Sequence, residues 1–464
     1  MAASPEKLLQ YFTAMDNQGG IVVKDAPKFD LETYIANYKG RTRFDRLLLI
    51  GQSSVALCVD ALKAALAEAK KGRDTARYRE AADLLRQASP REAEALVDAQ
   101  WADATEKANR EETRRLEQEL KGYKNNLVRE SIRMGNEDLG KHLEAIGDLL
   151  GAAEAYSRMR PDVTTSKQIV DVGKHLVNIA LQKRDWATLI ANLNKIAALQ
   201  GQLSDDTGLD TYLRAINGVS LLGQAKFREA AESFLKADNQ APSGHYSEAL
   251  SPNDVAVYGG LLSLATMGRK EIQARVLDNQ NFRPFLELEP HIRRAITLFV
   301  NGRYSACLVI LEGYRADYLL DLYLQKHVPY IYLQIRSKCI SQYLNPFSCV
   351  TLACLNESFA IEGESIEDEL VAMISNGTLN ARIDTVDKMV ITTTARPRAQ
   401  MQAAAINTVL AYEREAAERL RRMNLMSADL EIRNQRRVLA GAPVASSMVT
   451  VTDDWYEETP PMAA

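Results

Sequence analysis

The chain has 464 residues, of which 46% are hydrophobic and 25% charged, and its formal net charge is −4. This length is sufficient for two or three domains, and the ordinary composition excludes a chain that is disordered or collagen-like over most of its length. The small net charge excludes a global attraction to nucleic acid or to an anionic membrane, so such binding would need a local patch.

The cysteines indicate a reducing compartment. There are five of them, and none belongs to a Cys-x-x-Cys pair that would indicate a disulfide framework or a zinc site. The N-terminus lacks the apolar core of a secretory signal, and no later run approaches the roughly 20 apolar residues that span a bilayer. We therefore expect a cytoplasmic and nuclear protein.

Residues 41–124 have the periodicity of helices, with breaks predicted near Gly72 and at Ser89-Pro90. Within this region a charged run has a glutamate four residues before a base at three places, which stabilises an exposed helix. The pairs are Glu106/Arg110, Glu111/Arg115 and Glu117/Lys121. A solvated face is the simpler interpretation, and a partner-binding helix is the alternative.

Between about residues 135 and 315 a pattern recurs, in which a polar turn precedes a bulky, a small and another bulky residue at helical spacing. The period of roughly 35–45 residues is typical of tetratricopeptide-like helical hairpins. One copy would indicate only an amphipathic helix, whereas several copies indicate stacked hairpins with a shared core. The copies are Gly147, Leu149, Ala152, Tyr156 and Met159; Arg184, Trp186, Leu189, Leu193 and Ile196; Ala225, Phe227, Ala230, Phe234 and Ala237; and Gly302, Tyr304, Cys307 and Leu311, with a weaker one around Gly268.

From Asn345 the pattern changes to a helix, a turn, a second helix and a hairpin, which is the order of a winged helix. The first helix is predicted to include Val350. The second is predicted to begin after the N-cap residue Ser365 and to end at a left-handed cap at Asn376-Gly377. The hairpin strands are predicted at residues 379–384 and 388–392.

Acidic residues surround the second helix of this predicted winged helix. They would repel the phosphates of DNA, so we expect the winged helix to contact protein. These residues are Glu362, Glu364, Glu367, Asp368 and Glu369.

Arginines concentrate between Arg396 and Arg437, and apolar residues recur among them at helical spacing. An amphipathic helix that joins a bundle explains both features, and RNA binding is the alternative. The apolar residues are Ile406, Val409, Leu410, Leu420, Met423 and Leu430. After Ala440 there is no helical recurrence, which predicts a mobile acidic tail.

The segment from Asn345 to Thr394, preceded by a helical array, resembles a PCI domain, the module shared by the proteasome lid, the COP-nine signalosome and translation initiation factor three. The stretch Leu120–Gly140 resembles a pattern shared by the subunit-one family of the signalosome and its proteasome-lid counterpart. Two more stretches, Phe29–Leu47 and Asp321–Tyr343, resemble the signalosome family. The resemblance covers roughly residues 29–430, and the sequence departs from the family pattern between Gln200 and Ala265 and in the C-terminal tail.

The resemblance implies a mainly α fold. A tetratricopeptide-like helical-repeat array would form a right-handed superhelix, followed by a winged-helix subdomain with a small β-hairpin and a C-terminal helix. The expected parts are a flexible segment at 1–28, a helical region at 29–120, the repeat array at 121–344, the winged helix at 345–394, a bundle helix at 395–440 and an acidic tail at 441–464.

The resemblance also implies a non-catalytic scaffold in a complex that removes the ubiquitin-like Nedd modifier from cullins of cullin-RING ubiquitin ligases. Expected partners are other PCI-domain subunits, the MPN-domain subunits of that complex and, through it, cullin-RING ligases. Neither DNA nor a membrane is expected. One interface is expected at the apolar residues of the C-terminal helix and another at a sheet edge. The hairpin residues expected there are Leu379, Ala381, Ile383, Val390 and Ile391.

No motif for catalysis stands out. The sequence has no phosphate-binding loop, no nucleophile elbow and no His-x-His zinc motif, and its five histidines are isolated. No catalytic, metal-binding or cofactor-binding residue is therefore predicted. Two other functions remain open, a scaffold in the proteasome lid and a PCI-type RNA-binding module.

Overall fold

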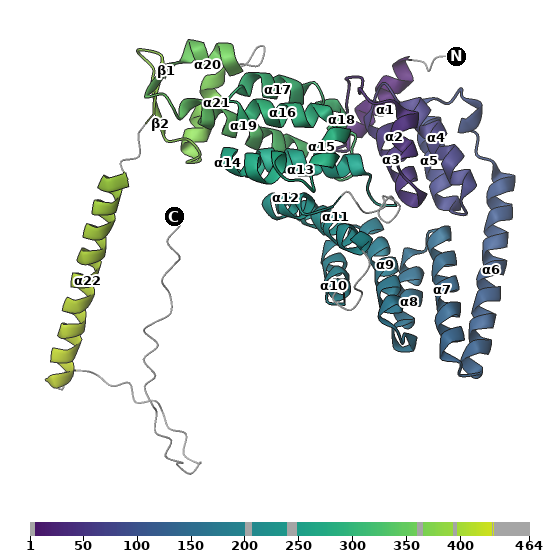
Figure 1. Cartoon of the computed structure of the whole chain (residues 1–464). Helices are drawn as coiled ribbons and strands as arrows, with labels where there is room; N and C mark the ends of the chain where they lie inside the picture. The colour runs from purple at the N-terminus through teal and green to yellow at the C-terminus, as the bar shows by residue number, and fades with distance from the viewer. Residues whose placement is uncertain are drawn as a thin grey trace. The chain divides into compact units, whose positions relative to one another are not determined.

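The computed structural model describes residues 5–199, 207–238, 248–359, 365–392, 397–428 and residue 430 (Figure 1). The chain divides into two compact units, Met1–Thr393 and Thr394–Ala464. Helices dominate both, and the small sheet of the first unit completes the predicted helical-repeat and winged-helix fold. The predicted acidic tail and the acids Glu362 and Glu364 lie outside the described residues.

The first unit begins with helices that pack around one core, in which Leu47, Leu62 and Tyr78 are buried. Residues 1–28 were expected to be flexible, but the structure has a helix there, because Tyr11 and Phe12 are buried in the same core. The predicted breaks at Gly72 and Ser89-Pro90 are confirmed by the ends of two helices. The helices are α1 (Pro5–Asn17), α2 (Leu31–Ala36), α3 (Gly40–Ser53), α4 (Cys58–Lys71) and α5 (Thr75–Ala88).

Helical hairpins follow, and each full copy of the sequence pattern begins the second helix of a hairpin. The residue two positions before that helix has a positive φ in all four copies, at Gly147, Arg184, Ala225 and Gly302. The pattern therefore marks the turn as well as the helix. The helices from the first hairpin onward are α6 (Ala99–Asn125), α7 (Arg129–Ile146), α8 (Leu149–Arg158), α9 (Ser166–Gln182), α10 (Trp186–Ala197), α11 (Thr207–Gly223) and α12 (Phe227–Leu235).

Glycines on one helix make room for the bulky residues of the next. A Cβ atom at Gly140 would lie 2.6 Å from the Tyr156 ring, and one at Gly218 would lie 2.7 Å from the Phe234 ring. Both rings are fully buried. The close approach of antiparallel helices therefore depends on glycine as well as on the predicted alanines.

The largest core begins in α9 and extends through the later helices into the winged helix. Tyr258, Phe282 and Phe299 are fully buried in it. The later helices are α13 (Pro252–Thr266), α14 (Arg269–Ile272), α15 (Arg283–Leu288), α16 (Pro290–Val300), α17 (Tyr304–Glu312), α18 (Arg315–Leu319) and α19 (Val328–Leu344).

The winged helix has three strands rather than two, in the order β1-β3-β2, all antiparallel. Val350 was predicted in a helix but lies in β1, because it pairs with Val390 of β3. Ser365 is the N-cap of its helix, and Gly377 has a φ of 72°, as predicted. The elements are β1 (Cys349–Thr351), α20 (Leu352–Phe359), α21 (Ile366–Ser375), β2 (Ala381–Asp384) and β3 (Met389–Thr392).

Candidate functional site

The described part of the second unit is dominated by one helix, α22 (Pro397–Ser427), of 31 residues. Alanines favour the helical backbone. Two ion pairs between residues one turn apart also stabilise it, Glu415–Arg419 at 2.6 Å and Glu418–Arg422 at 2.8 Å. The helix lies within the predicted bundle segment 395–440. Local sequence therefore accounts for the backbone of α22, and its side chains raise a separate question.

All six apolar residues predicted for the C-terminal interface are exposed, with exposed fractions between 44% and 70%. Val409, Leu420 and Met423 recur at helical spacing and lie on one face, whereas Leu430 lies beyond the end of the helix. Tyr412, which is 75% exposed, shares that face. Tyr412 was not among the predicted interface residues, although its spacing from Val409 places it on the same face.

The five predicted hairpin residues of the winged helix are divided between core and surface. Leu379, Ala381 and Val390 are buried in the core of the first unit, and Ile383 packs against that core. Ile391 is 41% exposed. Because β3 is central, β1 and β2 form the two edges of the sheet. Of the five predicted residues, Ile391 is therefore the one best exposed for apolar contact with a partner. The edge strands β1 and β2 can in addition offer main-chain N–H and C=O groups to a partner strand.

A buried ion network joins the N-terminal helices to the helices before the winged helix. The Nη1 and Nη2 atoms of Arg46 lie 2.7 Å from Asp321 Oδ2 and 2.9 Å from Asp254 Oδ2. Tyr34 accepts a bond from Arg46 at 2.5 Å, and Tyr258 donates to Asp321 at 2.7 Å. The network closes a contact between parts of the chain that are far apart in sequence.

Arg46 is the one cation among the residues named in this network, and it faces the carboxylates of Asp254 and Asp321. Burial alone would lower the pKa of Arg46, but Asp254 and the other nearby acidic groups outweigh it and raise the pKa, so the guanidinium remains charged. Burial raises the pKa of Asp254, and Arg46 opposes that shift. A buried pair of this kind is costly to break because the remaining partner keeps an uncompensated charge.

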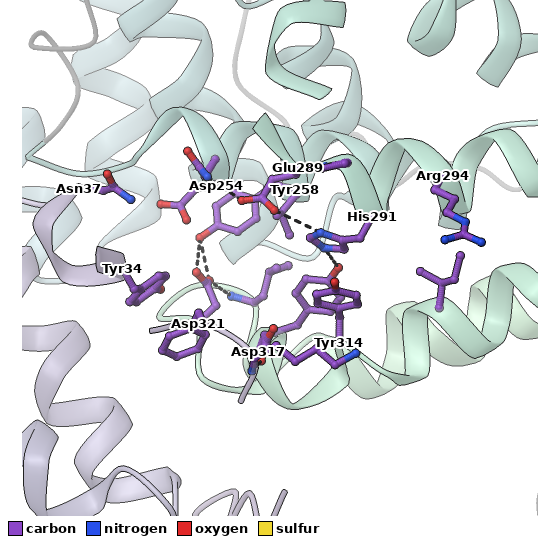
Figure 2. Close-up of a pocket in the computed structure, with 18 of the residues that line it drawn as sticks. Tyr34, Asn37, Asp254, Tyr258, Glu289, His291, Arg294, Tyr314, Asp317 and Asp321 are labelled. Atoms are coloured by element: carbon purple, nitrogen blue, oxygen red, sulfur yellow. Dashed lines mark hydrogen bonds and ion pairs between the residues drawn. The ribbon is translucent and has the colours of Figure 1, made fainter. Parts of the chain in front are cut away.

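A cavity of about 770 Å³ lies beside the network (Figure 2). His291 lies between Glu289 Oε2, 3.3 Å away, and the hydroxyl of Tyr318, 2.8 Å away. Burial, and then Lys28, lowers the pKa of His291 to about 4, so the ring is neutral near pH 7 and its 3.3 Å contact with Glu289 is not an ion pair at that pH. Glu289 also accepts a 2.7 Å bond from Asn253. The polar groups of the cavity are therefore largely engaged with one another.

Among the described residues no group of three or more His, Cys, Asp or Glu side chains is placed to hold a metal ion. Of the five cysteines, Cys58, Cys307 and Cys339 are buried, and burial raises the pKa of each thiol. None of the helices in the described ranges combines the length and apolar character needed to cross a bilayer.

Comparison with known proteins shows the family of the chain. The model of the 26S proteasome subunit RPN7 family matches residues 98–275, and the PCI domain model matches residues 311–394. The COP9 signalosome complex subunit 1 of Neurospora crassa is 50% identical over 445 residues, which cover 96% of this chain and 98% of that protein. The chain belongs to the COP9 signalosome subunit 1 family.

Two further members of this family are also similar. The subunit 1 of Emericella nidulans is 47% identical over 89% of this chain and 84% of that protein. That of Arabidopsis thaliana is 34% identical over 88% of this chain and 92% of that protein. The resemblance to signalosome subunit one is thereby confirmed. The stretches Phe29–Leu47 and Asp321–Tyr343, which indicated this family, meet in the structure through Arg46 and Asp321.

Proposed function

We propose that this chain is a non-catalytic scaffold subunit of the COP9 signalosome and that α22 is its main assembly element. The relatives carry the name of that complex. The family resemblance implies that the complex removes the Nedd modifier from cullins of cullin-RING ligases and that another subunit holds the isopeptidase. Its partners are then PCI-domain and MPN-domain subunits, in cytoplasm and nucleus.

The observation that carries this proposal is the exposed apolar face of α22. Val409, Leu420 and Met423 are each at least 60% exposed on a helix of 31 residues. Exposure of such a face to water is unfavourable, and its burial in a helical bundle lowers the free energy by about 25 cal/mol for each Å² buried. At 1.5 Å per residue the helix is roughly 46 Å long, which is enough for several turns of contact with neighbouring helices.

The edges of the winged-helix sheet support a second contact. An edge strand can add a strand from a neighbouring subunit through main-chain hydrogen bonds. The side chains of Leu379, Ala381 and Val390 serve the chain's own core, so Ile391 is the predicted hairpin residue best placed to add apolar contact. The acidic helix α21 weighs against DNA at this surface, because Glu367 and Asp368 are exposed.

RNA binding by α22 is the alternative function. Two of its arginines, Arg419 and Arg422, are in ion pairs with glutamates of the same helix. Paired arginines release fewer counterions on binding phosphates, and the apolar face has no role in such binding. Protein contact therefore explains more of the helix.

The test is reconstitution of the complex from co-expressed subunits. The double substitution Val409→Glu/Leu420→Glu puts two charges on the apolar face of α22, and we expect it to remove this chain from the complex on size-exclusion chromatography. Asn407→Glu/Ala411→Glu adds the same charge to exposed positions on another face of the helix and is expected to assemble normally. The thermal unfolding of the free chain should be unchanged in both.

Three outcomes would contradict the proposal. One is normal assembly of the Val409→Glu/Leu420→Glu chain. Another is recovery of this chain with proteasome base subunits rather than with signalosome subunits. The last is tight, steeply salt-dependent binding of RNA by α22, which would favour the RNA-binding alternative.

A further inference from the structure

The corner between α6 and α7 is an exposed surface that the assembly proposal does not use. Residues 121–130 are all exposed, and they include the last turn of α6 and the first residues of α7. Leu127 is 81% exposed, Val128 50% and Tyr123 37%. Three large apolar side chains are therefore presented to solvent within six positions of one corner.

The backbone makes Leu127 more unusual. Its φ is 54°, in the left-handed region that costs an ordinary residue about 1–2 kcal/mol and that suits glycine or asparagine. The corresponding turn residues of other hairpins are Gly147 and Gly302, or the small or polar Ala225 and Arg184. The leucine side chain therefore neither favours the turn conformation nor packs in the core. Contact with another molecule would account for a leucine at this position.

The same corner carries unpaired positive charge. Lys121, Lys124 and Arg129 form no ion pair with the described residues, so the predicted Glu117/Lys121 pair is not formed. Nearby Glu130 is held by Arg133 at 2.7 Å. The macrodipole of α6 favours the two lysines at its C-terminal end, but Arg129 lies at the start of α7, where the dipole disfavours a cation. The N-cap of α7 is Val128, and no described side chain caps its first N–H groups.

We propose that this corner binds an acidic segment of a partner protein that also carries aliphatic side chains. The carboxylates would meet Lys121, Lys124 and Arg129 and the free N–H groups of α7. The aliphatic side chains would pack on Leu127 and Val128. A nucleic acid fits less well, because bases stack on aromatic rings and the corner offers one such ring, that of Tyr123.

The test uses the full-length chain and three fluorescent probes, each with a benzophenone at one end. One is a peptide of about 12 residues that mixes glutamate and leucine, the second has serine in place of leucine, and the third is oligouridylate of similar charge. Fluorescence anisotropy measures affinity, and mass spectrometry locates the crosslink. We expect the leucine peptide to bind about tenfold more tightly than the serine peptide and to crosslink within residues 121–134.

Substitutions assign the binding to the corner. Leu127→Asn suits the positive φ, so it should preserve the fold while making the leucine peptide bind about tenfold more weakly. Leu96→Asn removes another exposed leucine, 77% accessible, and should change nothing. Lys121→Glu/Arg129→Glu should abolish binding, whereas Lys107→Glu/Arg114→Glu, at exposed positions of α6, should not.

Several results would overturn the proposal. They are equal affinity for the leucine and serine peptides, tighter binding of oligouridylate, crosslinks confined to other parts of the chain, and unchanged affinity after Leu127→Asn. Absence of binding by every probe up to about 1 mM would do the same. None of these results bears on the role of α22, which is tested separately by reconstitution.

Discussion

The Nη1 atom of Arg46 lies 2.7 Å from Oδ2 of Asp321, although 275 positions separate the two residues in the chain. Arg46 is fully buried, and its second amino group binds Asp254. Around it, the main-chain N–H of Lys28 donates to Asp317 at 2.8 Å, and the amide of Gln325 donates to Ser53 at 2.8 Å. The N-terminal helices are thus joined to the segment that leads into the winged helix.

Loss of the Arg46 side chain should destabilise the chain strongly. Arg46→Met leaves Asp254 and Asp321 as buried, uncompensated carboxylates, and we expect the free energy of unfolding to fall by about 3–5 kcal/mol. Urea denaturation followed by circular dichroism measures it. Arg43→Met is the control, because Arg43 is 35% exposed and lies 3.6 Å from Glu68, and it should cost less than about 1 kcal/mol. Equal effects would refute a special role for Arg46.

The neutral state of His291 should make stability depend on pH. Its pKa is lowered from 6.5 to about 4 in the folded chain, so the unfolded chain takes up a proton first as the pH falls. The contribution of neutral His291 to the free energy of unfolding is fully present above pH 6.5. It is lost as the pH falls from 6.5 to about 4, and the loss is at most about 3 kcal/mol.

Burial raises the pKa values of Glu289 and Asp317, which lie near His291. Because the folded chain then binds protons before the unfolded chain does, these two groups make the free energy of unfolding rise as the pH falls, opposite to the effect of His291. The measurement is therefore the difference between the native chain and His291→Phe, which keeps a ring against Tyr314. We expect the difference in unfolding free energy to vary between pH 6.5 and 4. Parallel pH profiles for the two chains would show that His291 titrates normally.

The packing of α7 against α8 should depend on the missing Cβ of Gly140. Gly140→Ala would place a carbon 2.6 Å from the buried Tyr156 ring, and we expect a loss of about 1–3 kcal/mol. Gly122→Ala in α6 is the control, because nothing lies within 4 Å of the added carbon. It should stabilise the helix by about 0.5–1 kcal/mol. Thermal unfolding of the two variants gives the comparison, and shifts of the same sign would contradict the packing argument.

A contact at the exposed face of the sheet should respond to a charge at Ile391, which lies on the central strand β3. Ile391→Glu changes a side chain that is 41% exposed, so the free chain should retain its thermal stability to within about 1 kcal/mol. Native mass spectrometry of the reconstituted complex should show loss of a neighbouring PCI-domain subunit, and Ile391→Val should retain it. Full retention of the neighbour by the glutamate variant would mean that this face of the sheet is not an interface.

Short-range patterns predicted much of the helical part. The turn residues Gly147 and Gly302 and the bulky residues that follow them mark hairpins, because helix, turn and packing face all depend on residues within about a dozen positions. Ser365 and Gly377 marked both ends of α21 for the same reason. The strand β1 was missed because three residues are too few to show alternation, and Val350 becomes a strand residue only by pairing with Val390.

The apolar stripe of α22 was also readable, because helical spacing places Val409 and Leu420 on one face whatever the helix contacts. For the hairpin the same reasoning could not separate core from surface. Alternation identifies two faces of a strand, but only the position of the sheet against α20 and α21 buries Val390 and leaves Ile391 exposed.

The helical hairpins, the second helix and the β-hairpin of the winged helix, and the family could all be predicted from the sequence, since each rests on local periodicity or on motifs along the chain. The burial of Arg46, Asp254 and Asp321 in one network is visible only in the folded chain. A lone arginine in a helix is ordinarily a surface residue, even beside apolar residues such as Phe44 and Leu47. Its partners lie more than 200 positions away, so the pairing exists only once the helices between them have packed.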